Sequence, residues 1–265
     1  PLAAPQMFAR ALRSASLLLA GAALTACWED ARLAEPDDDI RLASEGRLQA
    51  TPTAPTKTAA PGLRVERLSA TGRTFGLYVP STYRPDTPAP VIFMLHGRGD
   101  TGGEGIALNF QQIAEDAGVV LVAPNSRGPT WDLILGEVGF DVAFIDGILR
   151  WTFDNINVDP ARLTLGGFSD GGTYATWLGL RNGALFAKLA VFSGCATVPS
   201  GRRGQPRLYV THGITDSAFP IDDCSRTLVP GLTERGYSVQ YQEYEAGHII
   251  PIEVADQVFA WIAGT

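Results

Sequence analysis

Hydrophobic positions along the chain follow two patterns, which meet near residue 63. Beyond that point, short apolar runs alternate with longer segments whose apolar residues recur at helical spacing. Runs such as 91–95 are apolar at every position, which is typical of parallel strands buried on both faces. The pattern predicts strands over 63–68, 74–79, 91–95, 119–123, 163–165, 189–192, 208–211 and 239–244, and helices over 106–117, 138–155, 172–181, 224–235 and 252–262. We therefore expect an α/β fold of three layers, with a mostly parallel sheet of about eight strands and helices on both faces.

The sequence before residue 63 divides at a cysteine. Two arginines precede an uncharged run over 14–26, rich in leucine and alanine, which is typical of a secretory signal and too short to span a bilayer. The run ends Leu24-Thr25-Ala26-Cys27 and resembles the lipobox of bacterial lipoproteins. That resemblance implies that residues 1–27 are a signal peptide with a lipobox, and that Cys27 is lipidated and becomes the first mature residue. An ordinary signal peptide with an incidental cysteine is the alternative.

Residues 28–62 lack apolar periodicity. They contain the acidic run 37–39 and the Thr-Pro-Thr-Ala-Pro-Thr tract over 51–56. Such a segment offers little apolar surface to bury, so we expect a disordered linker and place the catalytic domain over 63–265. The protein would then be an exported lipoprotein, anchored in a membrane and facing the periplasm or the cell surface.

Composition narrows the possible partners. The chain has 265 residues, 45% of them hydrophobic, and a formal net charge of −7. The acidic balance argues against a nucleic-acid partner, because phosphate binding needs a basic face. With Cys27 lipidated, Cys195 and Cys224 are the two remaining cysteines. An exported protein meets an oxidising environment, so we expect these two to form a disulfide.

The stretch 167–171 reads Gly-Phe-Ser-Asp-Gly, a G-x-S-x-G pattern. It follows an apolar run and precedes a predicted helix, so Ser169 is expected on a tight turn at the carboxyl edge of the sheet. The alternative is a glycine-rich turn whose serine only caps the helix. The chain order of nucleophile, acid and base decides which other residues could complete a catalytic triad.

The three histidines, His96, His212 and His248, each lie beside a glycine just past a predicted strand. In an open α/β sheet, ligands bind at the carboxyl ends of the strands, so the histidines are expected near Ser169. His248 alone follows both the serine and a loop carboxylate, and we assign it as the general base. Asp216, in the loop after the strand that carries His212, is the expected acid. Asp222 and Asp223 are instead expected to cap the next helix.

Stabilisation of an oxyanion needs two backbone donors. We assign the N–H of Asp170, at the head of the helix, and the N–H of Arg98, in the glycine-rich loop after the strand over 91–95. The side chain of Asp170 is expected to have a structural role at the helix N-terminus. No His-Glu-x-x-His motif or close histidine pair is present, so we expect no metal.

Several motifs recur in the order of one known family. They resemble the phospholipase/carboxylesterase branch of the α/β-hydrolases, close to secreted polyhydroxybutyrate depolymerase-like and feruloyl esterase-like enzymes. The matching segments are 96–100, 123–132, 167–171, 212–216 and 247–248. The resemblance implies an α/β-hydrolase fold and a serine esterase that needs no metal or organic cofactor.

The resemblance also implies that the segment 125–140, with Trp131, forms part of the pocket wall. We assign Trp131 and Phe168 to the substrate pocket, while a loop with one anchoring tryptophan remains the other interpretation. The expected activity is hydrolysis of carboxylic esters through an acyl-enzyme on Ser169. Feruloyl or polyester depolymerisation and acyl transfer are alternatives, and a binding lipoprotein without catalysis is a further one.

Overall fold

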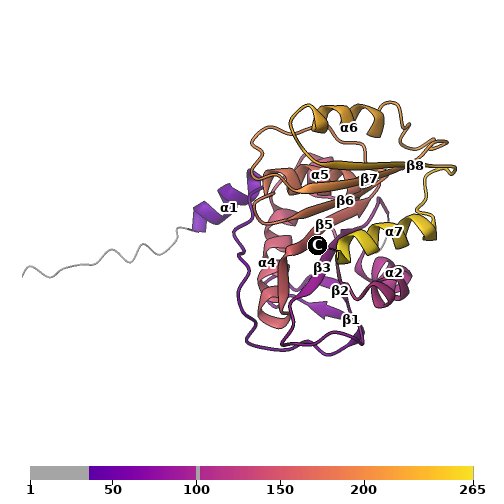
Figure 1. Ribbon diagram of the computed structural model, residues 1–265. Helices are drawn as coiled ribbons and strands as arrows, with labels where there is room; N and C mark the ends of the chain where they lie inside the picture. The colour runs from indigo at the N-terminus through magenta and orange to yellow at the C-terminus, as the bar shows by residue number, and fades with distance from the viewer. Residues whose placement is uncertain (1–35, 100–101, 265) are drawn as a thin grey trace, which may run out of the picture. The chain divides into compact units, whose positions relative to one another are not determined.

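A computed structural model of the protein describes residues 36–99 and 102–264, and Figure 1 shows how its helices and strands are arranged. The strands are β1 (Gly62–Arg67), β2 (Thr74–Val79), β3 (Ala89–Leu95), β4 (Val120–Pro124), β5 (Val158–Phe168), β6 (Lys188–Phe192), β7 (Arg207–Gly213) and β8 (Val239–Tyr244). The helices are α1 (Pro36–Ser44), α2 (Gly103–Ala117), α3 (Asp132–Leu135), α4 (Phe140–Asn155), α5 (Asp170–Arg181), α6 (Ser225–Thr233) and α7 (Ile252–Ala263).

The strands form one sheet in the order β1-β2-β4-β3-β5-β6-β7-β8. The pairs β1–β2 and β2–β4 are antiparallel, and every pair from β4–β3 to β7–β8 is parallel. The α/β fold with a mostly parallel sheet is therefore confirmed. Because β3 and β5 to β8 all run in one direction, the loops that follow them meet at a single edge of the sheet.

Helices cover both faces of the sheet (Figure 1). One core cluster joins apolar side chains of α4, α5 and α6 to the sheet, and a second joins those of α2 and α7 to the other face. Strands β3, β4 and β6 are buried at every position, as strands covered by helices on both sides must be. This double burial explains why β3 and β4 are continuously apolar rather than alternating, while the buried Lys188 that begins β6 donates to the carbonyls of Trp261 and Ile262.

The expected disordered linker over 28–62 is wrong for the part that the structure describes. We call residues 36–61 the N-terminal strap. It begins with helix α1 and then runs along α4, where Asp146 Oδ1 accepts hydrogen bonds from the backbone N–H groups of Gln49 and Ala50 at 2.6 and 2.8 Å. Further along, the carbonyl of Asp154 accepts the N–H groups of Thr56 and Lys57.

The strap is ordered without an apolar stripe. Three small side chains, Ala43, Ala50 and Ala59, are buried against the body. Most of its other contacts are hydrogen bonds from its backbone, or from Arg47, to acceptors on α4, on Asn182 after α5 and in the loop around residue 201. Backbone hydrogen bonds of this kind produce no hydrophobic periodicity, which is why the sequence pattern predicted a linker here.

Residues 1–35 lie outside the described residues, and with them the predicted signal peptide, the lipidation site Cys27 and the start of the predicted linker. Within the described part of the chain, none of the helices combines the length and apolar character needed to cross a bilayer.

Candidate active site

Ser169 lies on a cramped turn between β5 and α5. Its backbone has φ 57° and ψ −123°, a conformation that non-glycine residues rarely adopt. Glycines on either side allow the turn to form. A Cβ on Gly167 would lie 2.4 Å from the backbone of Gly171, and a Cβ on Gly171 would lie 2.3 Å from the carbonyl of Leu95. The G-x-S-x-G pattern therefore forms the expected strand–turn–helix unit.

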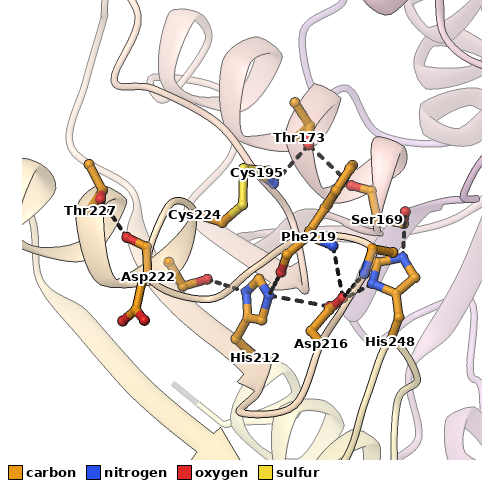
Figure 2. Close-up of a disulfide and its surroundings, with 12 residues drawn as sticks. Ser169, Thr173, Cys195, His212, Asp216, Phe219, Asp222, Cys224, Thr227 and His248 are labelled. Atoms are coloured by element: carbon orange, nitrogen blue, oxygen red, sulfur yellow. Dashed lines mark hydrogen bonds and ion pairs between the residues drawn. A yellow bond between two sulfur atoms is a disulfide. The ribbon is translucent and has the colours of Figure 1, made fainter.

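The structure brings Ser169, His248 and Asp216 together in one hydrogen-bonded chain (Figure 2). His248 Nε2 lies 2.8 Å from Ser169 Oγ, and His248 Nδ1 lies 2.6 Å from Asp216 Oδ2. The acid sits in the loop after β7, and the histidine sits in the loop between β8 and α7. The three groups come from separate loops at the same sheet edge, as their chain order predicts.

The carboxylate of Asp216 is buried and well supplied with donors. Its Oδ1 accepts hydrogen bonds from the N–H groups of Ala218 (2.9 Å) and Phe219 (2.8 Å). Burial alone would raise its pKa, but the hydrogen bonds from His248 and from these two backbone groups outweigh burial and hold the pKa below its ordinary value. Asp216 therefore stays ionised and can stabilise a protonated His248.

Two phenyl rings flank the imidazole of His248. The Phe168 ring centroid lies 4.7 Å from it, and the Phe219 ring meets it edge-on at 5.4 Å. The side chain is 22% exposed, so one edge of the ring faces solvent beside Ser169. The rings fix the plane of the imidazole while leaving Nε2 open to a substrate.

A cavity of about 380 Å³ opens above the serine, lined by Gly97, Arg98, Phe168, Ser169, Asp170, Ala218, Phe219 and His248. A Cβ on Gly97 would lie 3.3 Å from the Cβ of Ser169, so the loop after β3 passes directly beside the nucleophile. Both residues assigned to the oxyanion site, Arg98 and Asp170, line this cavity. Their backbone roles remain a prediction.

The side chain of Asp170 joins three segments. Its Oδ2 accepts hydrogen bonds from Thr130 Oγ1 at 2.7 Å and from Arg98 Nε at 3.2 Å. The carboxylate thus fastens the loop after β3, and the segment before α3, to the turn that carries Ser169. This matches the structural role expected for Asp170, although no sequence pattern predicted the contact with Thr130.

Trp131 does not line the cavity, so its assignment to the substrate pocket is wrong. Its side chain is fully buried, its Nε1 donates to the carbonyl of His96 at 2.8 Å, and its ring contacts those of His96 and Tyr174. The interpretation of the loop with one anchoring tryptophan is the correct one. The Nε2 atom of His96 accepts a hydrogen bond from the N–H of Ser126 at 3.0 Å and helps to hold the same loop.

Phe168 does lie at the site. It lines both the cavity above Ser169 and a neighbouring apolar groove of about 370 Å³. The groove lies between α2 and the segment that joins His248 to α7, and is lined by Ile106, Asn109, Phe110, Ile113, Phe168, His248, Ile249, Ile250, Ile252 and Ala255. An ester bound at Ser169 can therefore extend an apolar group into this groove.

The other cysteines and aspartates considered in the sequence lie around the triad. Cys195 and Cys224 form a disulfide with a Cα–Cα distance of 4.4 Å. Cys224 itself is the N-cap of α6, so the expectation that Asp222 or Asp223 caps this helix is wrong. The carboxylate of Asp222 instead pairs with Arg226, in the first turn of the helix.

A second buried carboxylate cluster lies between the segment 125–132 and the start of α4. Asp141 is fully buried and accepts hydrogen bonds from Arg73 (2.5 Å) and from the N–H groups of Arg127 and Asp132 (both 2.9 Å). Asp132 in turn accepts the hydroxyl of Tyr174 and the N–H of Asp141. Burial raises the pKa of Asp141, while Arg73 opposes that rise.

Solved structures share the fold of this chain. A CE1 ferulic acid esterase from Anaeromyces mucronatus, solved with ferulic acid, superposes with a TM-score of 0.61 at 16% identity, covering 83% of this chain and 98% of that one. The crystal structure of esterase PE8 gives a TM-score of 0.53 at 24% identity, covering 66% and 95%. Together with the eight-stranded sheet, these likenesses identify the fold as that of the α/β-hydrolases.

Relatives at higher identity define the family. A probable feruloyl esterase C of Aspergillus oryzae is 34% identical over 212 residues, which are 66% of this chain and 76% of that protein. Feruloyl esterase C of Emericella nidulans is 34% identical over 158 residues, and the match spans 57% of each protein. No model of a known protein family matches the chain. The chain belongs to the feruloyl esterase C-like α/β-hydrolases.

Proposed function

We propose that the protein is a serine esterase that hydrolyses carboxylic esters through an acyl-enzyme on Ser169. One observation carries the proposal: an unbroken hydrogen-bond path from Ser169 Oγ through His248 to a buried, ionised Asp216. A serine hydroxyl is a poor nucleophile until a base removes its proton, and that base needs an acid to hold its tautomer. All three parts are present at hydrogen-bonding distance, beside an open cavity.

The first half of the reaction forms the acyl-enzyme. Ser169 Oγ attacks the ester carbonyl as its proton passes to His248 Nε2, and the N–H groups of Arg98 and Asp170 stabilise the oxyanion. Each such donor is worth about 2.7–4 kcal/mol in comparable sites. The protonated His248, stabilised by Asp216, then gives its proton to the leaving alkoxide. The alcohol departs and the acyl group remains on Ser169.

The second half frees the enzyme. His248 takes a proton from water, and the resulting hydroxide attacks the carbonyl carbon of the acyl-enzyme. The second oxyanion that forms is stabilised by the same donors. The proton returns from His248 to Ser169 Oγ as the carboxylic acid leaves. If an alcohol enters instead of water, the same steps give acyl transfer.

Feruloyl-type esters are the favoured substrate class. The relatives above are named feruloyl esterases, and the apolar groove beside His248 offers room for an apolar or aromatic group. We expect methyl ferulate to give a higher kcat/KM than p-nitrophenyl acetate, butyrate or a 3-hydroxybutyrate ester. A preference for the hydroxybutyrate ester would instead favour the polyester alternative.

Covalent labelling separates catalysis from binding alone. A fluorophosphonate should label the described domain at Ser169, and Ser169→Ala should abolish both labelling and ester turnover. His248→Ala should lower kcat to a similar extent, and the double variant should lose little more, because triad members act as one unit. A Ser169→Ala variant that hydrolyses esters at the wild-type rate would sink the proposal. A wild type that binds esters without turnover would indicate a binding lipoprotein.

Export and lipid anchoring complete the proposal. The run over 14–26 that ends at Cys27 supports an exported lipoprotein, and so does the disulfide, which suits an oxidising compartment. Cys27→Ser should release the protein from the membrane fraction or block its processing. A variant that stays fully membrane-bound and normally processed would argue for another mode of attachment.

A further inference from the structure

A second histidine contacts the carboxylate of Asp216. His212, on β7, is fully buried. Its Nε2 lies 2.8 Å from the carbonyl oxygen of Phe219 and 3.3 Å from Asp216 Oδ2. Both neighbours of Nε2 are hydrogen-bond acceptors, so this nitrogen must carry a proton. The triad described above makes no use of His212.

Ser225 decides the state of the other ring nitrogen. Its buried hydroxyl lies 2.6 Å from His212 Nδ1 and can donate to it. A doubly protonated His212 would direct a second cation at Asp216 Oδ2, the same oxygen that receives the Nδ1–H of His248. It would then weaken the attraction of Asp216 for the imidazolium that forms at His248. The neutral form, protonated on Nε2, is the one that suits the triad.

His212 also closes the turn that carries the acid. Its Nε2–H faces the Asp216 carboxylate at one end of the turn and the Phe219 carbonyl at the other. The N–H groups of Ala218 and Phe219 donate to Oδ1 and His248 donates to Oδ2, while His212 Nε2 lies 3.3 Å from the same Oδ2, so polar groups surround the carboxylate. A carboxylate has about four acceptor sites, so Asp216 has little freedom to rotate. The Phe219 ring in turn packs on His248.

The disulfide links this assembly to the nucleophile, as Figure 2 shows. Ser225 directly follows Cys224, which is bonded to Cys195. The N–H of Cys195 donates to Thr173 Oγ1 at 2.9 Å, and the N–H of Thr173 donates to the carbonyl of Ser169 at 3.0 Å. A path with one covalent bridge therefore runs from the turn at Ser169 to the histidine behind the acid.

We propose that His212 is a positioning residue for Asp216, that Ser225 holds the His212 ring in place through Nδ1, and that the Cys195–Cys224 disulfide holds this pair against the helix of the nucleophile. The proposal rests on the esterase function above. It predicts that damage to residues that never touch substrate lowers kcat with little change in KM, because the acid loses its orientation and the pocket does not.

Other polar groups face the same site and bear on its pH dependence. Asp216 is faced by both histidines and by the phenol of Tyr244 on β8. His212 is faced by Glu243, which is paired with Arg226 of α6. None of these groups changes in a Ser225 variant. A shift of the pH profile in that variant therefore reports the contact between His212 and Asp216.

Ser225→Ala is the decisive variant. Without the donated hydroxyl, Nδ1 of the buried His212 has lost its hydrogen-bond donor, and the ring is held less firmly between Asp216 and the Phe219 carbonyl. We expect kcat to fall roughly ten- to a hundredfold, as misplaced catalytic groups do, with KM within about twofold. The acid limb of kcat/KM should move to higher pH, because a carboxylate with fewer donors holds the His248 proton more tightly.

Thr211→Val is the matched control. It removes a buried hydroxyl next to His212 that has no hydrogen-bond partner among the residues that the structure describes. Its kcat and pH profile should equal those of the wild type. His212→Gln keeps an N–H donor toward Phe219 and should retain more kcat than His212→Leu. If folded Ser225→Ala keeps the wild-type kcat and pH profile, the positioning role is wrong. If its loss only matches a loss of fluorophosphonate-labelled sites, the role is merely structural.

The disulfide is tested by a double-mutant cycle. Replacing both Cys195 and Cys224 by serine should lower kcat, and adding Ser225→Ala should then cost little more, since both changes act through His212. Fully additive losses would remove the disulfide from the proposal. The melting temperature of each variant is measured as well, and the proposal does not require its fall to follow the fall in kcat.

The tautomer of His212 can be read without any turnover. In histidine-labelled protein, ¹⁵N NMR should show one ring protonated on Nε2 alone, with Nδ1 accepting a hydrogen bond. The same signal should change in Ser225→Ala. If the wild type shows this signal and no ester turnover, the esterase function fails while the tautomer assignment stands. If turnover is normal and His212 carries a proton on Nδ1, the positioning proposal fails alone.

Discussion

Among the buried carboxylates of the described residues, those around Asp216 and around Asp141 form two clusters with different roles. Both accept several N–H donors, and both tie loops at the carboxyl edge of the sheet to a neighbouring helix or strand. Asp216, however, has the imidazole of His248 as a partner, whereas Asp141 has the guanidinium of Arg73, which is exposed to the same extent, and backbone groups. A carboxylate can act in proton chemistry only when one partner can change its charge.

The direction of the pKa shift separates the two clusters as well. Donors outweigh burial at Asp216 and lower its pKa, while burial outweighs Arg73 at Asp141 and raises its pKa. Burial by itself therefore does not mark a functional acid in this molecule. What marks the functional acid is its connection to Ser169 through a ring that can take up a proton.

The largest contrast is expected in activity. Asp216→Asn should lower kcat by about 10⁴-fold, because the histidine loses its orienting charge and takes the wrong tautomer. Asp141→Asn should leave kcat within a few fold of wild type once folded protein is counted by active-site titration. Steady-state kinetics on p-nitrophenyl acetate measure both. Equal losses in the two variants would erase the distinction between the clusters.

The contrast should reverse in stability. Asp141→Asn puts an amide group where the buried carboxylate accepts Arg73 and two backbone N–H groups, and should lower the free energy of unfolding by about 1–3 kcal/mol, as a buried donor left unpaired does. In Asp216→Asn the amide oxygen can still accept the N–H groups of Ala218 and Phe219, so the loss should be smaller. Urea unfolding at neutral pH gives both values. An Asp141→Asn variant as stable as the wild type would show that this cluster does not hold the fold.

The smallest expected effect is in the pH dependence of stability, where the two variants should differ in the sign of the slope. The folded-state pKa of Asp216 is lowered, so its contribution to stability is present above an unfolded value of about 3.9 and is lost as pH falls through the folded value. The pKa of Asp141 is raised, so its ionisation costs stability as pH rises from about 3.9 through the folded value. The stability advantage of wild type over Asp216→Asn should therefore grow with pH, and that over Asp141→Asn should shrink. If both stability differences changed with pH in the same direction, the pKa directions assigned to Asp216 and Asp141 would be contradicted.

Local patterns in the sequence predicted the strands, the turn at Ser169 and the triad order, because apolar runs and glycine spacing are written in adjacent residues. Contacts between distant segments left no such record. The buried pair of His212 and Ser225 depends on how β7 and α6 meet, and the N-terminal strap depends on acceptors such as Asp146 about a hundred residues away. Trp131 could be read as anchor or pocket wall until its indole N–H was seen to donate to His96.

The N-terminal strap also changes the working distance of the enzyme if Cys27 is its lipid anchor. A disordered linker over 28–62 would let the active site sweep a wide volume above a membrane. Helix α1 begins at Pro36, so eight residues, 28–35, separate it from Cys27, and their fully extended length is about 28 Å. Such an enzyme would act on esters close to its own envelope, within a shorter reach than a disordered linker over 28–62 would allow.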